Sequence, residues 1–518
     1  MKKNFKRVAL TAAALGTAVV LTACGGADKV ATEDASSTNI KYWIPLSGNA
    51  SQIVTNLAET PLAQKLMEKF GCTIEYLHPA QGQDAEKFNL LVASGDLPDI
   101  IEYKWMTAYQ GGPQKAIADG VVYPLDLEKD APNLYAYAKE NPDIDKMMKT
   151  DDGQYFGYPF IRGDEYLLTS AGLIVREDWL NDLGLELPET LDDWTTMLAA
   201  IKENKSSGAP IGSTLSGAIS QGSFVSAFGI HDGFYLEDGQ VKYGPMDDRY
   251  KDFLAYMNDW YKKGYIDQDY ASPNAASAQS NILNGVNGVA FGSCGSGIGK
   301  WMAAAPDEKF SIIGVKNPVK NKGEVPMYGN YQNPVTGTIA VISMDAKNKD
   351  LCAKVLDYGY SEEGKMLFNF GIEGESYNMV DGYPTYTEEI TANPDGLSMA
   401  VSMSRYTMSH AESCFIQDKR YMEQYAQLPQ QKAALDNWMA TDVAEHFLPP
   451  ITITMEQQME LISAIDNINT YKAEMQVKFI TGIEPLENFD KFREGLKERQ
   501  IETYLKYQQE AYERYLKR

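Results

Sequence analysis

The chain has 518 residues, 47 of them basic and 71 acidic, which gives a formal net charge of −24 at pH 7. A surface this negative repels nucleic acid, and no basic arm is available to hold it. A chain this long also exceeds what a single hydrophobic core supports, so we expect two lobes.

The first residues predict a secretory leader. Residues 1–7 (MKKNFKR) carry four basic side chains and no acid, and residues 8–23 are apolar or small throughout. This run is shorter than the roughly 20 residues of a membrane-spanning helix. It ends in LTAC, residues 21–24, which resembles the lipobox of bacterial lipoproteins. An ordinary signal peptide beside a chance cysteine is the alternative.

The lipobox resemblance implies that residues 1–23 are removed and that Cys24 becomes a diacylated N-terminus. Two acyl chains are enough for stable anchoring. Residues 24–39 are small and polar without an apolar period, which predicts a flexible tether. We therefore expect a lipid-anchored protein on the extracellular face of the cell membrane, and Gly25–Gly26 resembles Gram-positive lipoproteins. Loss of the four basic leader residues would lower the net charge to −28.

Strand-like and helix-like segments alternate after Ile40, with short connections between them. This alternation predicts a parallel α/β lobe. Beyond about Asp418 the apolar period becomes helical, so we expect a helical C-terminal region. We expect strands at 40–46, 72–79 and 97–103, helices at 58–71 and 84–96, and a helix with a strand-like end within 107–125.

Six segments, spread in order over most of the chain, carry a family pattern. They read LVASGDLPDII (91–101), DGVVYPLD (119–126), DDGQYFGYPF (151–160), LIVREDWLNDLGLELPETLDDWTTML (173–198), NGVNGVAF (284–291) and GIEGESYNM (371–379). In this order they resemble the family-1 extracellular solute-binding proteins, the carbohydrate receptors of ATP-binding-cassette (ABC) importers, to which maltose-binding protein is distantly related. Residues 473–496 resemble the tail of the larger Gram-positive oligosaccharide-binding lipoproteins.

The resemblance implies an α/β, two-lobe periplasmic-binding-protein-like fold of type II, each lobe a mostly parallel sheet flanked by helices. The ligand cleft lies between the lobes, which agrees with the tendency of open α/β sheets to bind ligands beyond their strand ends and of such lobes to close by hinge bending. By resemblance the chain crosses between lobes near 160–165 and 328–334, and returns after about Tyr386. Lobe 1 would comprise residues 40–163 and 330–385, and lobe 2 residues 164–329 and 386–518.

Residues 288–301, GVAFGSCGSGIGKW, suggest a phosphate-binding loop or a cysteine nucleophile. The phosphate-loop pattern requires glycine six positions before Lys300 and a hydroxyl after it, but these positions hold Cys294 and Trp301. Cys294 has no recognisable histidine partner, so we interpret it as a buried small hydrophobe. We expect a strand, a turn and a helix start that form one wall of the cleft.

No metal or cofactor is predicted. Residues 201–212 stand where some alginate-binding relatives carry a calcium loop, but they lack the spaced carboxylates that calcium needs. The remaining cysteines have irregular spacings, which excludes a cysteine metal cluster and leaves the pairing of one disulfide open. They are Cys72, Cys294, Cys352 and Cys414.

A sugar site pairs aromatic rings with sugar faces, and carboxylates, amides or arginine with hydroxyls. Residues of these kinds at strand ends, at both crossings and in the glycine-rich loop are our predicted ligand contacts. They are Trp43, Ser47, Asn49, Lys104, Trp105, Tyr158, Arg162, Asp164, Glu165, Ser216, Gln221, Ser296, Trp301, Asn330, Tyr331, Gln332, Glu375 and Tyr377.

The resemblance implies a monomeric, non-enzymatic receptor that delivers an oligosaccharide or related glycan to the transmembrane subunits of an ABC permease. A peptide or another polar solute is an alternative ligand. A surface enzyme that hydrolyses glycans and a sensory lipoprotein are alternative functions, since the 71 acidic residues always supply some carboxylate pair. Lys104 and Arg162 would suit an anionic glycan, but the negative surface disfavours its approach.

Overall fold

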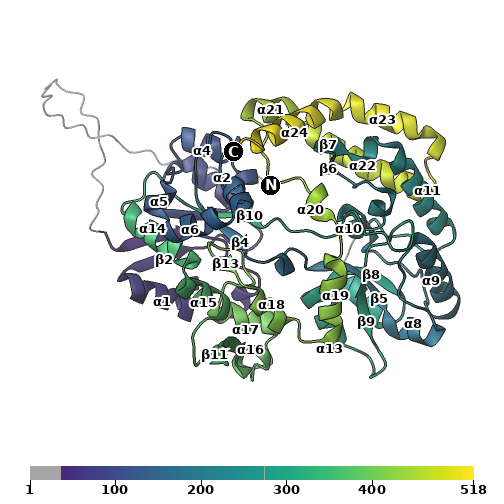
Figure 1. Ribbon diagram of the computed structural model, residues 1–518, viewed down its shortest axis with the longest axis horizontal. Coiled ribbons are helices and arrows are strands. Elements are labelled where there is room, and N and C mark those ends of the chain that lie inside the picture. The colour runs from purple at the N-terminus through teal and green to yellow at the C-terminus, as the bar shows by residue number, and fades with distance from the viewer. Residues whose placement is uncertain (1–36, 273–274) are drawn as a thin grey trace, which may run out of the picture.

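A six-stranded sheet forms the core of the first lobe (Figure 1). The computed structural model describes residues 37–272 and 275–518, so the predicted leader, Cys24 and most of the predicted tether lie outside the described residues. The strand order is β13-β4-β10-β3-β1-β2. The strands are β1 (Asn39–Trp43), β2 (Thr73–Leu77), β3 (Ile100–Tyr103), β4 (Tyr158–Arg162), β10 (Val335–Ile342) and β13 (Ile416–Gln417).

The alternation predicted between residues 40 and 103 is confirmed, with helices α1 (Pro61–Phe70) and α2 (Asp84–Ser94) between the first three strands. Local chemistry explains the bounds of α1. The hydroxyl of Thr60 accepts a hydrogen bond from the Ala63 N–H at its start, and Gly71 ends it with a φ of 59°.

A three-stranded sheet, β8-β5-β9, forms the core of the second lobe. It consists of β5 (Ala171–Arg176), β8 (Val289–Ser293) and β9 (Ile312–Val315). Two hairpins lie apart from both sheets: β6 (Phe234–Glu237) with β7 (Gln240–Tyr243), and β11 (Tyr377–Val380) with β12 (Tyr383–Tyr386).

Strand direction differs from the expected mostly parallel pattern in the second lobe. β1 runs parallel to β2 and β3, but β5 is antiparallel to both of its neighbours. The reason is that the chain enters β5 directly from the other lobe. β5 therefore starts at the edge where β8 ends, as the pairing of Ala171 with Ser293 shows. β10 is entered in the same way, and its Val335 pairs with Ile161 at the end of β4.

Within the described residues, three segments connect the lobes. The first joins β4 to β5, and the second joins β9 to β10, at the two places where crossings are expected. The third crossing, expected after Tyr386, is wrong in position. Ile416 of β13 pairs with Ile161 in the first sheet, and Cys414, Phe415 and Ile416 lie in the core of the first lobe. The chain therefore leaves that sheet only after Gln417, and residues 416–417 belong with the first lobe.

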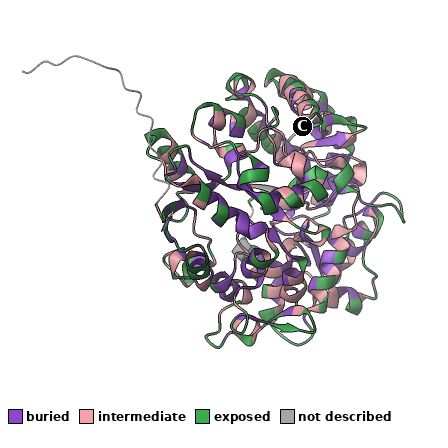
Figure 2. Cartoon of the chain, turned by 60° about the vertical axis from the view of Figure 1, so that its left-hand side comes forward, coloured by how far each residue is buried: buried purple, intermediate pink, exposed green. Residues whose placement is uncertain are grey.

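Both faces of the six-stranded sheet are buried. Successive side chains of a strand point to opposite faces, so Tyr42 enters one hydrophobic core and its neighbour Trp43 enters another. Figure 2 shows the buried strands inside and the exposed surfaces on the outer helices. Helices of the first lobe and the segments packed on it are α3 (Trp105–Ala108), α4 (Gly112–Ala118), α5 (Leu127–Asp130), α6 (Pro132–Glu140), α7 (Pro142–Met147), α14 (Lys349–Asp357), α15 (Glu362–Phe370), α16 (Glu388–Thr391) and α17 (Met399–Tyr406).

The second lobe is mainly helical around its short sheet. Its hydrophobic core includes Trp194, Phe224 and Trp260, whose rings make successive edge-to-face contacts. Between the first and second crossings the helices are α8 (Glu177–Leu183), α9 (Leu191–Asn204), α10 (Leu215–Ser220), α11 (Asp248–Lys262), α12 (Ala275–Leu283) and α13 (Lys300–Ala303). Helix α18 (Lys419–Tyr425) lies in the third crossing, and α19 (Pro429–Met439) and α20 (Val443–His446) follow it.

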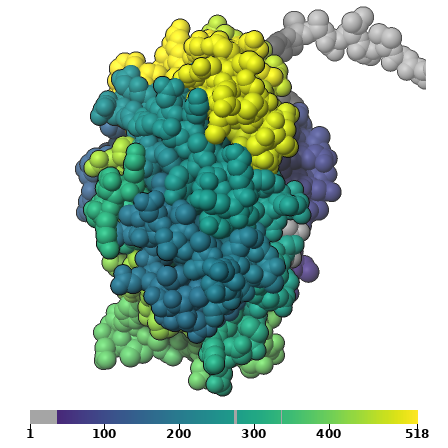
Figure 3. Space-filling view, turned by 90° about the vertical axis from the view of Figure 1, so that its right-hand side faces the viewer, coloured from purple at the N-terminus to yellow at the C-terminus, as the bar shows by residue number. Residues whose placement is uncertain are grey.

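The predicted helical C-terminal region forms an arm of four helices, α21 (Met455–Leu461), α22 (Ala464–Thr481), α23 (Phe489–Glu498) and α24 (Ile501–Tyr515). Helix α22 packs against α11 of the second lobe, and Figure 3 shows the arm in yellow against that lobe in teal. The arm also reaches the first lobe. The Gly111 N–H donates to the side chain of Gln458 over 3.1 Å, and Arg514 and Arg518 each lie 2.6 Å from the carboxylate of Asp151.

Candidate functional site

A cavity of about 370 Å³ lies where the three crossings meet, between the ends of β4, β8 and β13. This volume is at the lower end of the roughly 300–1,000 Å³ typical of small-molecule sites. Its walls come from both lobes and from all three crossings. The lining residues include Asn49, Phe160, Arg162, Ser170, Ser293, Ser296, Gln332, Ser409, His410, Glu412, Gln417, Tyr421 and Tyr425.

Arg162 supplies the positive charge of the cavity from the end of β4. Its Nη1 donates to Oε1 of Gln417 over 3.2 Å, and its Nη2 lies 3.3 Å from Oε1 of Glu412. The guanidinium also stacks over the ring of Phe160 at 5.1 Å. The Nε of Arg162 is buried and has no hydrogen-bond partner.

His410 forms a second polar point beside two aromatic rings. Its ring contacts Tyr421 edge-on at 5.5 Å and Tyr425 at 4.3 Å between ring centroids. Burial lowers the pKa of His410 to about 4, so the imidazole is neutral at pH 7. Its Nε2 is buried and has no partner. The cavity thus offers a neutral imidazole and two tyrosine rings close together.

The glycine-rich loop forms part of one wall, as expected. It is a single π-helical turn, η6 (Cys294–Gly299), after β8. A Cβ on Gly295 would lie 2.1 Å from the hydroxyl oxygen of Tyr425, so only glycine fits there. The hydroxyls of Ser293 and Ser296 hydrogen-bond to each other over 2.6 Å at the surface of the cavity.

Two residues of this loop have structural roles. Cys294 is buried, and burial raises the pKa of its thiol to about 12, which is unsuited to a nucleophile. Trp301 is only 5% exposed and packs in the hydrophobic core behind the loop, with Gly292 against its ring. Its predicted role as a stacking platform is therefore not supported by its position.

Four of the predicted ligand contacts line the cavity: Asn49, Arg162, Ser296 and Gln332. Five others, Trp301 included, are core residues whose burial leaves no face for a ligand. The other four are Trp43, Trp105, Tyr158 and Tyr377. Trp43 and Trp105 are predicted contacts because they stand at strand ends, but neighbouring side chains cover both rings.

Several predicted contacts shape the crossings without lining the cavity. Oδ1 of Asn330 accepts from the N–H of Ser170 and of Ala171 over 3.1 and 3.2 Å, and its Nδ2 donates to Gln221 over 3.0 Å. Asn330 thereby holds the start of β5 against the second crossing. Asp164 accepts from the Tyr166 N–H and pairs with Lys419, and Tyr331 packs on Phe447. Ser47 lies away from the crossings, in the loop after β1, where its hydroxyl accepts from the Ala50 N–H.

The remaining predicted contacts lie elsewhere. Lys104, Glu165 and Glu375 are exposed and Ser216 is half-buried on α10, and none of these lines the cavity. Sequence reasoning missed His410, Glu412 and Gln417, and the tyrosines of α18. No local pattern marks them, because their place in the cavity follows from the pairing of β13 with β4.

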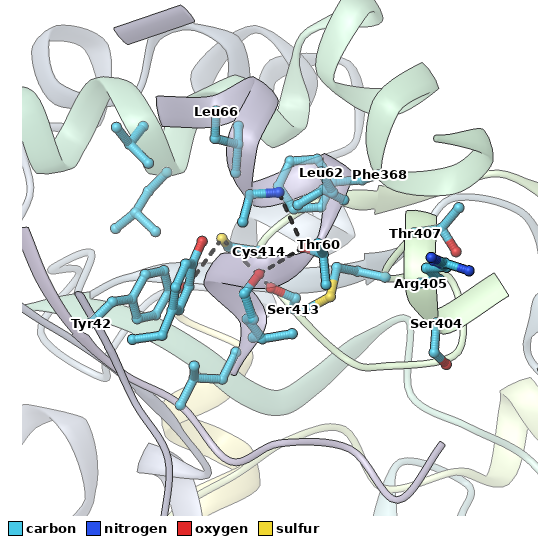
Figure 4. Close-up of a pocket in the computed structure, with 17 residues that line it drawn as sticks. Tyr42, Thr60, Leu62, Leu66, Phe368, Ser404, Arg405, Thr407, Ser413 and Cys414 are labelled. Atoms are coloured by element: carbon cyan, nitrogen blue, oxygen red, sulfur yellow. Dashed lines mark hydrogen bonds between the residues drawn. The ribbon is translucent and has the colours of Figure 1, made fainter. Parts of the chain in front are cut away.

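A mostly apolar cavity inside the first lobe lies between β1, α1 and α17 (Figure 4). Tyr42, Leu66, Phe368 and Cys414 contribute to its walls. Its volume is about 30 Å³, which is enough for roughly one water molecule. We therefore assign it to core packing.

Within residues 37–272 and 275–518, no group of three or more His, Cys, Asp or Glu side chains is placed to hold a metal ion. Among the same residues, no helix has the length and apolar character needed to cross a membrane.

The model of the bacterial extracellular solute-binding protein family matches residues 55–366. The chain belongs to this family. It is 24% identical over 428 residues to the lipoprotein LipO of Bacillus subtilis, covering 78% of this chain and 82% of LipO. It is 26% identical over 292 residues to FusA, a fructooligosaccharide ABC transporter substrate-binding protein of Streptococcus pneumoniae, which covers 52% of this chain and 53% of FusA.

Solved structures of similar proteins have the same two-lobe α/β fold. The alginate-binding protein AlgQ2 without calcium superimposes with a TM-score of 0.72 at 22% identity, covering 94% of this chain and all of AlgQ2. FusA of S. pneumoniae in complex with kestose gives a TM-score of 0.71 at 22% identity, with 92% and 99% coverage. The family and these relatives are binding proteins, so this chain is a solute-binding protein.

Proposed function

We propose that the chain is the extracellular substrate-binding lipoprotein of an ABC importer and that it binds an oligosaccharide between its lobes. The composition of the cavity carries this proposal: a guanidinium, hydroxyl and amide groups, and two tyrosine rings converge there from both lobes. Sugars need such donors and acceptors for their hydroxyls and aromatic rings for their faces. The names of FusA and AlgQ2, both sugar-binding proteins, support the same ligand class.

In this proposal Asn49, Arg162, Ser296 and Gln332 are ligand contacts, and the missed residues His410, Tyr421 and Tyr425 join them. The chain acts as a monomer and performs no chemistry. Ligand binding favours the closed arrangement of the lobes, which the transmembrane subunits of the permease recognise. The lipid on Cys24 and the tether that follows keep the protein beside the permease.

We assign the lobes from strand pairing. The first comprises residues 37–163 and 335–417, and the second residues 171–315 and 429–518, with the crossings between them. We count the C-terminal arm with the second lobe because α22 packs against α11. The arm also contacts the first lobe.

Isothermal titration calorimetry with a panel of neutral and acidic oligosaccharides tests the ligand class on the chain without residues 1–24. We expect at least one saturable ligand, and a roughly two- to twelvefold loss of its affinity in Tyr425→Ala, because a stacking ring contributes about 0.5–1.5 kcal/mol. Tyr507→Ala on α24, a tyrosine that does not line the cavity, serves as the matched control. A panel without any heat of binding would refute the carbohydrate assignment.

Two further measurements separate the proposal from its alternatives. Metabolic labelling with palmitate should mark the full-length chain and not Cys24→Ser. Incubation of the protein with its tightest ligand should release no new reducing ends, whereas their appearance would identify a glycan hydrolase instead.

A further inference from the structure

We propose that the cavity selects uncharged sugars and rejects carboxylated ones, because Glu412 already occupies the guanidinium of Arg162. This inference rests on the proposed function and names the class of sugar that the cavity accepts.

The pair is built into the cavity wall. The side chain of Arg162 is 11% exposed, and its Nη2 lies 3.3 Å from Oε1 of Glu412. The other carboxylate oxygen of Glu412 accepts a hydrogen bond from the hydroxyl of Thr338 over 2.9 Å. Both oxygens of Glu412 therefore have partners on β4 and β10. The side chain of Glu412 nevertheless remains 42% exposed, so its charge faces an incoming ligand.

The rest of the cavity adds no compensating positive charge. Among its lining residues that the structure describes, Arg162 is the only arginine or lysine and Glu412 the only aspartate or glutamate. Burial keeps the pKa of His410 at about 4, so this imidazole is neutral. The formal charges of the lining residues therefore sum to zero, whereas the chain as a whole carries −24.

A sugar carboxylate in this cavity has two unfavourable choices. It can remain beside Glu412, where the two like charges repel each other. It can instead displace Glu412 from Arg162, which leaves that carboxylate without its cation. A neutral sugar meets neither cost. Its hydroxyls can pair with polar groups of the lining, such as the hydroxyls of Ser293 and Ser296 and the amide of Gln332.

Pairs of trisaccharides that differ chiefly in their carboxylate groups isolate the effect of ligand charge on affinity. Calorimetry would compare galactotriose with trigalacturonate and mannotriose with trimannuronate, together with kestose, on the wild-type chain, Glu412→Gln and Glu412→Asp. We expect the wild type to prefer the neutral sugars at least tenfold. Glu412→Gln should lower this preference at least tenfold, chiefly through tighter binding of the acidic sugar, since a freed guanidinium binds carboxylate through two hydrogen bonds. Glu412→Asp, which keeps the charge, should retain the preference.

Glu445→Gln, an exposed glutamate of α20 outside the cavity, is the matched control and should leave the ratio unchanged. Thermal unfolding of each variant shows whether it is folded. Binding of the acidic sugars by the wild type at equal or higher affinity would overturn the inference, and so would an unchanged ratio in Glu412→Gln. Either result would leave the proposed function intact, whereas the absence of binding to every sugar would refute the proposed function itself.

Discussion

Replacement of Glu102 by glutamine should change how the stability of the first lobe depends on pH. Glu102 lies on β3 and is fully buried. One of its carboxyl oxygens accepts the hydroxyls of Tyr42 and of Ser413, the latter over 3.2 Å, while Oε1 has no partner. Burial is the largest cause that raises the pKa of Glu102 from 4.5 to about 7.

The raised pKa means that the folded protein holds this proton more tightly than the unfolded chain does. The protonated carboxyl therefore contributes stability that is fully present below pH 4.5 and is lost as the pH rises through about 7. Each pKa unit corresponds to about 1.4 kcal/mol, so the contribution lost over this range is about 3 kcal/mol. Glutamine does not titrate and should remove this component of the pH profile.

Urea unfolding of the wild type and Glu102→Gln between pH 4.5 and 8 tests this reasoning. The free energy of unfolding of the wild type should fall relative to that of the variant by about 3 kcal/mol across the range. His231 and His410, whose pKa values burial lowers to about 4, act in the opposite direction, but their effect cancels in the difference. The exposed Glu75→Gln on β2 is the control. Parallel profiles of the wild type and Glu102→Gln would refute the assigned pKa.

Three further changes have outcomes that follow from the contacts. Asp151→Asn leaves two arginines of the C-terminal region without their carboxylate and should lower the free energy of urea unfolding by about 3 kcal/mol. Gly295→Ala should displace the ring of Tyr425 and weaken sugar binding in calorimetry at least tenfold, while Gly217→Ala, with open space around its Cβ, should not. Trp301→Ala should reduce stability by about 3–5 kcal/mol through the cavity it creates, as chemical unfolding would measure.

Local patterns made the first part of the fold predictable. The apolar residues of β1, β2 and α1 follow their helix and strand periods, and Thr60 and Gly71 mark the ends of α1. The same patterns do not reveal which faces are covered. Trp43 could have faced a ligand at its strand end, but helices cover both sides of the sheet and place it in a core.

Long-range pairing made half of the cavity unpredictable. β13 has only two residues, too few to show an alternating pattern, and its position depends on pairing with β4. That pairing places Gln417 beside Arg162 although 255 residues separate them in the chain. Arg162 could be selected because its strand ends at an expected crossing. His410 and Glu412 could not, because their place follows from where β13 docks.

The crossings give the ligand contacts of the proposed receptor two different roles. Backbone hydrogen bonds join all three crossings: the Arg162 N–H donates to Pro334 over 2.8 Å, and the Gly163 N–H donates to Gln417 over 3.1 Å. A sugar held by Arg162 is thus held by the hinge itself, so that contact can form before the lobes close. Contacts from single lobes, such as Asn49 and Ser296, form together only on closure. Since a ligand shifts an equilibrium only through interactions that differ between two states, the single-lobe contacts are those that drive closure.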